Sequence, residues 1–255
     1  MTHPLIVIPA RMGSTRFPNK PLAKIKGVAM VERVWRIGRA AGAQVVVATD
    51  DAELAHFAKG FGAEVVMTHP THKTGSDRAA EVADHFPDAA VILVLQGDAP
   101  LTPPWVVKAL LDEMERHPNV EVATPAVRLT GEAKVAFIQS KREGSSTGTT
   151  VVFDLNRDAL YFSKALLPFS RKGEPEIFRH IGLYAYRREA LLRLTRLPQS
   201  PLEKTEGLEQ LRALENGIPI RIVEVDYRGR THGSVDRPED IATVEEIIER
   251  EGELV

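Results

Sequence analysis

The sequence contains no cysteine, and this absence excludes several kinds of chemistry. Disulfide bonds, catalysis by a thiolate and zinc sites built on cysteine are all ruled out. The eight histidines show no HxH or HExxH spacing, so a histidine-based zinc site is not indicated either. A chain without cysteine is compatible with a reducing compartment, and we expect a cytoplasmic protein.

Long apolar runs and a large charge of one sign are also missing. No stretch is long and apolar enough to cross a bilayer, and residues 1–11 lack the features of a signal peptide. A formal net charge of -2 does not favour nucleic acid or a membrane surface as a partner. What remains is an ordinary globular composition, with 43% hydrophobic and 27% charged residues in a chain of 255. We expect one domain over residues 1–255, large enough to bury a substantial core.

Short apolar runs alternate with helical patterns over the first hundred residues. The predicted strands are 5–8, 44–50, 64–68 and 90–98, and the predicted helices are 29–41, 51–62 and 76–86. Continuous apolar strands separated by helices favour an α/β fold with a parallel sheet covered on both faces.

The second half of the chain has a different pattern. It predicts an edge or mixed strand at 120–129, a mobile loop at 131–148, short strands at 150–154, 159–163 and 218–226, a strand that becomes a helix over 181–194, and helices at 201–217 and 237–252. We interpret 125–215 as a lobe inserted into the core.

Ligands of parallel sheets bind beyond the carboxyl ends of the strands, so the loop after residue 8 is a candidate site. It contains Arg11, Ser14, Arg16 and Lys20. Backbone N–H groups and cations in such a loop can hold phosphates. Proline follows Lys20, so the loop is not a Walker A motif, and it is not GxGxxG. A solvated basic loop is the alternative, and Arg16 is interpreted as a residue that only shapes the loop.

Three later segments offer further polar groups. Thr74 and Gly75 open a predicted helix and could present donors, although simple N-capping explains them equally well. Gln96 and Asp98 follow the strongest predicted strand, where a carboxylate could hold Mg²⁺. Asp236 is a second candidate carboxylate. A turn at Asp98 and a helix cap at Asp236 are the alternatives.

The order of these motifs resembles one family closely. Over nearly the whole chain the sequence shows PARMGSTRFPNKPL, VVVATDD, TGSDR, LQGDAP, RHIGLYAYRREAL, PLEKTEGLEQLRALENG and VDRPEDI. The first motif would suit a wider group of sugar nucleotidyltransferases. RHIGLYAYR together with LEQLRALE is similar to the 3-deoxy-manno-octulosonate (Kdo) cytidylyltransferases, also called CMP-Kdo synthetases.

The resemblance implies a fold and a reaction. The fold would be a Rossmann-like three-layer α/β/α core with a mostly parallel sheet and an inserted α+β lobe for sugar binding and dimerisation. The reaction would transfer CMP from CTP to the anomeric hydroxyl of Kdo with Mg²⁺, releasing pyrophosphate, for lipopolysaccharide synthesis by a homodimer. In-line attack on the α-phosphorus depends mainly on positioning and charge neutralisation.

The resemblance also implies roles for individual residues. Arg11, Lys20 and Asp98 would be catalytic, and Asp98 and Asp236 would hold the metal. The residues implied to bind the nucleotide are Pro9, Ala10, Arg11, Ser14, Lys20, Thr74, Gly75, Arg78, Gln96 and Asp98. Those implied to bind the sugar are Lys164, His180, Tyr184, Glu209 and Gln210. Without the resemblance, Glu209 and Gln210 would be interpreted as an exposed helical face.

The chain departs from the family pattern at three places. Ala99 stands where glutamate is often found, Thr149 and Thr150 stand where a lysine is usual, and Lys164 replaces an arginine. Lysine keeps the charge but loses the bidentate fork that grips a carboxylate. Other acidic sugars, such as 8-amino-Kdo, therefore stay open as substrates, and so does a CTP-binding protein without catalytic activity.

Overall fold

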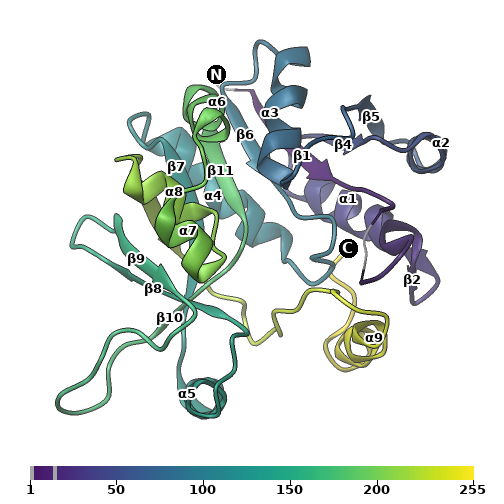
Figure 1. The fold of residues 1–255 in the computed structure, drawn as a ribbon. Helices are drawn as coiled ribbons and strands as arrows, with labels where there is room; N and C mark the ends of the chain where they lie inside the picture. Colours follow the sequence, from purple (N-terminus) through teal and green to yellow (C-terminus); the bar gives the residue numbers. More distant parts are fainter. Residues whose placement is uncertain (1–2, 14–15) are drawn as a thin grey trace.

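The computed structural model describes residues 3–13 and 16–255. Ser14, predicted to bind the nucleotide, lies outside the described residues. Within them the chain forms a ten-stranded sheet in the order β5-β4-β1-β6-β11-β7-β10-β8-β9, with β12 paired to β7 (Figure 1). The strands of this sheet are β1 Pro4–Pro9, β4 Gln44–Thr49, β5 Glu64–Met67, β6 Val91–Val94, β7 Val122–Arg128, β8 Thr149–Phe153, β9 Ala159–Ser163, β10 Phe178–His180, β11 Tyr184–Arg187 and β12 Ile220–Glu224.

The sheet is parallel in its first part and mixed in its second. Strands β5, β4, β1 and β6 are parallel, as their uninterrupted apolar sequences predict. Strand β11 then runs antiparallel between β6 and β7. Strand β7 is an interior strand, because β11 and β10 pair antiparallel along one of its edges and β12 pairs parallel along the other. The mixed alternative for 120–129 is therefore right, and the edge alternative is wrong.

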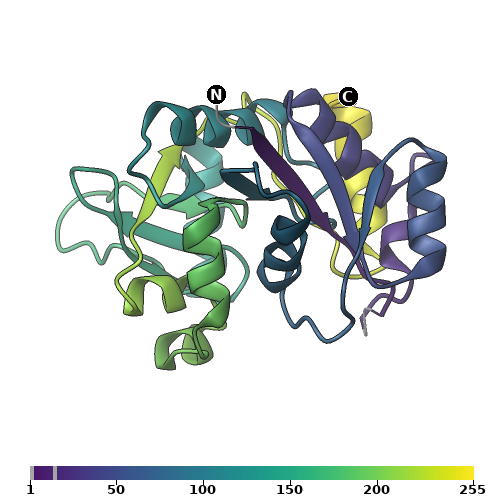
Figure 2. The ribbon, with the colours of Figure 1, turned by 90° about the horizontal axis from the view of Figure 1, so that it is seen from above.

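Helices cover both faces of the sheet. The helices of the described residues are α1 Met30–Ala40, α2 Ala52–Gly60, α3 Gly75–His85, α4 Pro104–Arg116, α5 Gly131–Arg142, α6 Arg188–Arg196, α7 Pro201–Glu206, α8 Gln210–Glu215 and α9 Asp240–Glu251. A hairpin, β2 Lys24–Ile25 with β3 Val28–Ala29, precedes α1. Figure 2 shows α1 and α4 on one side of the sheet and α3 and α6 on the other. The α/β class predicted from the alternating pattern is confirmed.

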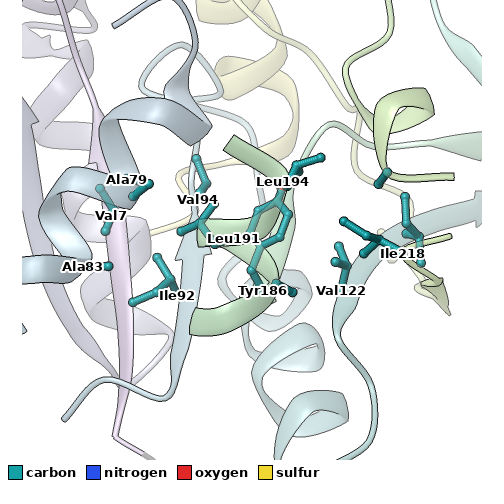
Figure 3. Close-up of a cluster of buried hydrophobic side chains, with 14 of the residues drawn as sticks. Val7, Ala79, Ala83, Ile92, Val94, Val122, Tyr186, Leu191, Leu194 and Ile218 are labelled. Carbon is teal, nitrogen blue, oxygen red and sulfur yellow. The ribbon is translucent and has the colours of Figure 1, made fainter. Parts of the chain in front are cut away.

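The core lies in two layers, one on each face of the sheet. On one face Leu5 and Val7 of β1 join a buried cluster with α3 and α6 (Figure 3). On the other face Ile6 and Ile8 pack against α1 and α4. A strand that buries both faces needs apolar residues at every position, which is why residues 5–8 show no alternation.

Two predictions for the second half are wrong. Residues 131–148 contain helix α5 rather than only a loop, and α5 has no buried residue, so it carries no amphipathic signal. Residues 201–217 form two short helices, because Gly207 adopts a left-handed conformation with φ 63° and ends α7. Helix α4 and strand β10 were not predicted. Strand β11 and helix α6 fall within 125–215 yet belong to the central sheet and its cover, so the lobe boundary stays a prediction.

Candidate active site

A pocket opens beyond the carboxyl ends of β1 and β6, where the parallel sheet predicts a ligand. The residues that line it are Pro9, Ala10, Arg11, Arg16, Lys20, Pro21, His72, Lys73, Thr74, Gly75, Arg78, Gln96, Gly97, Asp98 and Asp236. Every described residue predicted for the nucleotide side is among them, and so is Asp236. The sequence-based prediction missed His72, Lys73 and Gly97, and it treated Arg16 as structural only.

The first loop is tied to both candidate metal carboxylates. Lys20 Nζ donates to Asp98 Oδ2 at 2.7 Å and to the Val235 carbonyl at 2.9 Å. Arg16 Nη2 lies 3.4 Å from Asp236 Oδ1. The Val235 N–H also donates to the Asp98 carbonyl at 2.9 Å, so the segment before α9 is fixed against the end of β6. Residues far apart in sequence thus share one electrostatic network.

Helix α3 begins at the pocket. Thr74 Oγ1 accepts from the Asp77 N–H, and Asp77 Oδ2 accepts from the Thr74 N–H, both at 3.1 Å. This capping box confirms the N-cap interpretation. The capped helix also directs its positive dipole end at the pocket, which favours a bound anion. Capping and phosphate binding are therefore compatible roles for this loop.

Two glycines allow the loops around the pocket to approach closely. A Cβ on Gly97 would lie 2.8 Å from the Pro9 carbonyl oxygen, and a Cβ on Gly75 would lie 3.0 Å from Pro9 Cγ. Neither has a positive φ, so the reason for glycine is the lack of space. The loops after β1 and β6 and the start of α3 thereby form one wall.

Arg78 is held in place from the neighbouring strands. Its side chain is buried, its guanidinium forms an ion pair with Asp50 at 3.2 Å, and it donates to Thr68 Oγ1. Asp50 follows β4 and Thr68 follows β5, so both partners lie at the carboxyl edge of the sheet. Arg78 can therefore stabilise the pocket wall even where it does not touch a ligand.

The acidic groups suit a metal that arrives with a phosphate ligand. In residues 3–13 and 16–255 there is no group of three or more histidine, aspartate or glutamate side chains that could hold a metal ion. Asp98 and Asp236 nonetheless line the same pocket. Mg²⁺ is usually held by one or two carboxylates, with phosphate oxygens and water completing the shell. The residues present fit such an ion.

Two of the residues predicted to bind the sugar, His180 and Tyr184, belong to a cluster of packed rings on β10 and β11. The rings of His180 and Tyr184 lie 5.5 Å apart, and Tyr184 stacks on Tyr186 at 5.8 Å. His180 Nε2 lies 2.9 Å from Thr124 Oγ1. Burial, followed by the charge of His232, lowers the pKa of His180 to about 3. The imidazole is therefore neutral at physiological pH, with one nitrogen that can donate a hydrogen bond and one that can accept.

Glu209 and Gln210 are not an exposed helical face. Gln210 is buried, and in the described chain its Nε2 atom has no hydrogen-bond partner. Burial raises the pKa of Glu209, against hydrogen bonds from Ser76 and Thr74 that lower it. Gly207 redirects the chain after α7, so that these side chains turn inward. Glu209 therefore connects the predicted sugar side with the nucleotide side.

Lys164 lies beside the same turn. Its Nζ atom is 3.4 Å from the place where a Cβ on Gly207 would lie, and its N–H donates to Glu206 at 3.0 Å. Thr150, where the family pattern has lysine, is buried and donates to the Ala165 carbonyl at 2.7 Å. The threonine is thus satisfied as a structural residue and supplies no cation.

Comparison with known proteins places the chain in a family. A family model described as cytidylyltransferase matches residues 5–223. The chain is 51% identical to the 3-deoxy-manno-octulosonate cytidylyltransferase of Maricaulis maris, covering 98% of this chain and 99% of that protein. It belongs to the 3-deoxy-manno-octulosonate cytidylyltransferase family. The Syntrophotalea carbinolica member is 43% identical over 94% of this chain and 96% of its own length.

Solved structures agree with this family. A structure of CMP:2-keto-3-deoxy-manno-octonic acid synthetase complexed with CTP has a TM-score of 0.88 at 35% identity, covering 98% of this chain and 100% of that one. A cytidylyltransferase from Leptospira borgpetersenii has a TM-score of 0.63 at 16% identity, covering 98% and 88%, which shows a shared fold alone. No helix in the described residues is long and apolar enough to cross a membrane.

Proposed function

We propose that this protein transfers CMP from CTP to the anomeric hydroxyl of Kdo and releases pyrophosphate. The observation that supports this best is that one pocket gathers the first-loop cations, the start of α3 and both candidate metal carboxylates. Family membership and the CTP-bound structural relative support the same reaction.

The cations of the pocket suit a triphosphate. Arg11 and Lys73 line it together with Arg16 and Lys20, against the carboxylates of Asp98 and Asp236. A nucleoside triphosphate would meet this excess of positive charge and the amino end of α3 at once. Arg11 and Lys20 would hold the charge that develops on the leaving pyrophosphate, and such contacts typically contribute about 10²–10³ in rate.

Asp98 and Asp236 would hold Mg²⁺, which would neutralise phosphate charge and polarise the attacked phosphorus. In the structure Asp98 pairs with Lys20 and Asp236 pairs with Arg16. Binding of the nucleotide and metal would therefore exchange one set of ionic partners for another: the lysine and arginine move to phosphate oxygens. Until then the two cations hold the carboxylates in position.

The first experiment is a pyrophosphate-release assay with several nucleotides and sugars. CTP with Kdo and Mg²⁺ should give rapid release, while UTP or GTP with a hexose 1-phosphate should give little. Asp98→Asn should abolish turnover while circular dichroism shows an intact fold. Absence of release with Kdo and every close 2-keto sugar acid would contradict the proposal, and a fully active Asp98→Asn enzyme would contradict the metal assignment.

A second acidic sugar is favoured by specific residues. Ala99, Thr150 and Lys164 depart from the family pattern, and the structure gives Thr150 a structural role with no free polar group. We therefore include 8-amino-Kdo in the assay. A higher kcat/KM for 8-amino-Kdo than for Kdo would assign it as the preferred substrate, and tight CTP binding without any turnover would favour a non-catalytic protein.

We also propose that the protein is a cytoplasmic homodimer that serves lipopolysaccharide synthesis. Several large apolar side chains are exposed in the predicted lobe, including Val135 at 67%, Leu160 at 63% and Phe169 at 87%. Leu160 lies on β9, an edge strand of the sheet. Light scattering should give a dimer mass for the wild type and a monomer for Leu160→Asp. A monomeric wild type would contradict this arrangement.

A further inference from the structure

Three cationic side chains lie near one another beside the start of β8, where burial and then the charges of Arg179 and Lys164 lower the pKa of Lys141. Lys141 Nζ, from the end of α5, donates to the Gly148 and Lys164 carbonyls, each at 2.6 Å. Arg179 Nε is 3.6 Å from the place where a Cβ on Gly148 would lie. We call Lys141, Lys164 and Arg179 the Gly148 cluster. Lys164 was already predicted to bind the sugar, so the cluster borders that side of the site.

The positive charge of this cluster is only partly balanced by the protein, through Glu206. In the described parts of the chain the buried Nε atom of Arg179 has no hydrogen-bond partner, and no carboxylate offsets the lowering of the Arg179 pKa by burial. The nearby carboxylate, Glu206, is already bonded to Ser163 Oγ at 2.6 Å and to the Lys164 N–H at 3.0 Å. Buried charges are normally paired, because an unpaired one is costly to remove from water. The arrangement therefore lacks an anion.

Two further polar atoms lie unpartnered beside Arg179. The Tyr227 hydroxyl and His232 Nδ1 are buried without a hydrogen-bond partner in the residues that the structure covers, and their rings are 5.8 Å apart. Burial, and then the charge of Arg179, lowers the pKa of His232 to about 4. Both groups can therefore give a hydrogen bond while they are uncharged, His232 through its Nδ1–H tautomer. An oxyanion next to Arg179 would satisfy them.

The position relative to the reacting groups is suitable. His232 lies only four residues before Asp236, and an extended chain of that length spans at most about 14 Å. Arg179 pairs with Thr150 across β10 and β8, so it stands opposite the position where the family pattern has lysine. Since Thr150 supplies no charge and Lys164 supplies no fork, Arg179 is the guanidinium of this cluster.

We propose that Arg179 binds the carboxylate of the sugar acid, with Tyr227 and His232 donating hydrogen bonds to the same group. This inference rests on the proposed function, because that reaction supplies the acid. A guanidinium presents two parallel donors that match a carboxylate, which neither lysine of the cluster can do. A phosphate would satisfy the same donors, so the experiment separates the two sources.

The test compares Arg179→Gln and Arg179→Lys with wild type, using CTP and Kdo as varied substrates. Loss of a charged hydrogen bond should raise KM for Kdo about 10- to 100-fold in Arg179→Gln, with partial recovery in Arg179→Lys and CTP affinity within about twofold. The matched control is Arg128→Gln, on the neighbouring strand β7, where the arginine is exposed and already paired with Glu224 and Glu176. It should keep both KM values.

Direct binding distinguishes the sources of the anion and covers loss of folding. By calorimetry, wild type should bind Kdo more tightly than its uncharged C1 amide, and Arg179→Gln should lose that preference. If Arg179→Gln does not fold, Tyr227→Phe should still weaken Kdo binding several-fold without affecting CTP. An unchanged preference for the acid would overturn the inference, and so would a defect confined to CTP or inorganic phosphate. Failure of the proposed function is separate, because it appears as a wild type that releases no pyrophosphate.

Discussion

Replacing Arg212 by methionine should show how much its buried ion pair with Glu203 contributes to the free energy of unfolding. Arg212 and Glu203 are joined by two hydrogen bonds, of 2.5 and 2.8 Å, and their side chains are only 6% and 5% exposed. Removing one partner of a buried pair typically costs about 3–5 kcal/mol, because the other charge is left without compensation. At about 2–4 °C per kcal/mol for a chain of this size, Tm should fall by roughly 6–20 °C.

The loss should depend on pH, which separates charge from packing. Burial by itself raises the pKa of Glu203, but the hydrogen bonds from Arg212 and from the Ser200 N–H lower it in the native protein. Without Arg212 that pKa should rise, so the variant regains stability as the carboxyl group is protonated at lower pH. The wild type keeps its Glu203 contribution until the pH falls through the lowered native pKa. The difference between the two proteins should therefore shrink between pH 7.5 and pH 5.

Urea denaturation at both pH values provides the measurement. Lys108→Met is the matched control, since Lys108 and Asp112 are 59% and 40% exposed and their pair should contribute less than about 0.5 kcal/mol. A loss below about 1 kcal/mol in Arg212→Met at pH 7.5 would refute the reasoning. So would an equal loss at both pH values, because it would assign the effect to shape alone.

Three other predictions concern the pocket and the buried histidines. Gly97→Ala should lower kcat/KM for CTP in steady-state assays, because its Cβ would meet a carbonyl oxygen of β1 at 2.8 Å. The control Gly60→Ala, whose Cβ would meet open space, should keep the wild-type value. A wild-type kcat/KM in Gly97→Ala would contradict the close approach. Lys20→Met should bind Mn²⁺ alone more tightly and CTP more weakly by calorimetry, since Lys20 pairs with Asp98, a proposed metal ligand. Weaker Mn²⁺ binding would refute this. Burial lowers the pKa of His180 to about 3 and of His232 to about 4, from an unfolded value near 6.5. Below pH 6.5 the unfolded chain therefore binds protons that the native protein does not, and the free energy of unfolding should fall towards pH 4 by up to about 1.4 kcal/mol per pH unit for each histidine. Urea titrations should show this slope, and it should be smaller in His180→Asn.

The parallel half of the fold could be predicted because its signals are local. Residues 5–8 and 91–94 are apolar at every position, and a strand with that sequence must bury both faces. Once the strands are parallel, the loops after them meet at one edge, which places the segments near Asp98 and Thr74 together. The position of the candidate pocket thus follows from pattern and topology, and the family resemblance added the prediction that CTP binds there.

Helix α5 shows why a residue-by-residue pattern fails in the second half. None of its residues is buried, so no apolar stripe marks residues 131–142 as a helix. The long side chain of Lys141 instead ties α5 to the rest of the lobe, because its ammonium group donates to the carbonyls of Gly148 and Lys164. Contacts of this kind depend on where β8 and β9 end in space. They have no period in the sequence and become visible only in the folded chain.

The positions of two of the residues predicted to bind the sugar depend on the backbone conformation of one residue, Gly207. If 201–217 were one continuous helix, helical spacing from α7 would decide which face Glu209 and Gln210 lie on. Gly207 has φ 63°, which ends α7 and lets α8 start in a new direction. Gln210 is then buried, and Glu209 meets the Ser76 and Thr74 side chains of the nucleotide loop. The turn at Gly207 therefore places Glu209 and Gln210 between the two predicted halves of the candidate site, and the buried Arg212–Glu203 pair holds that turn in place.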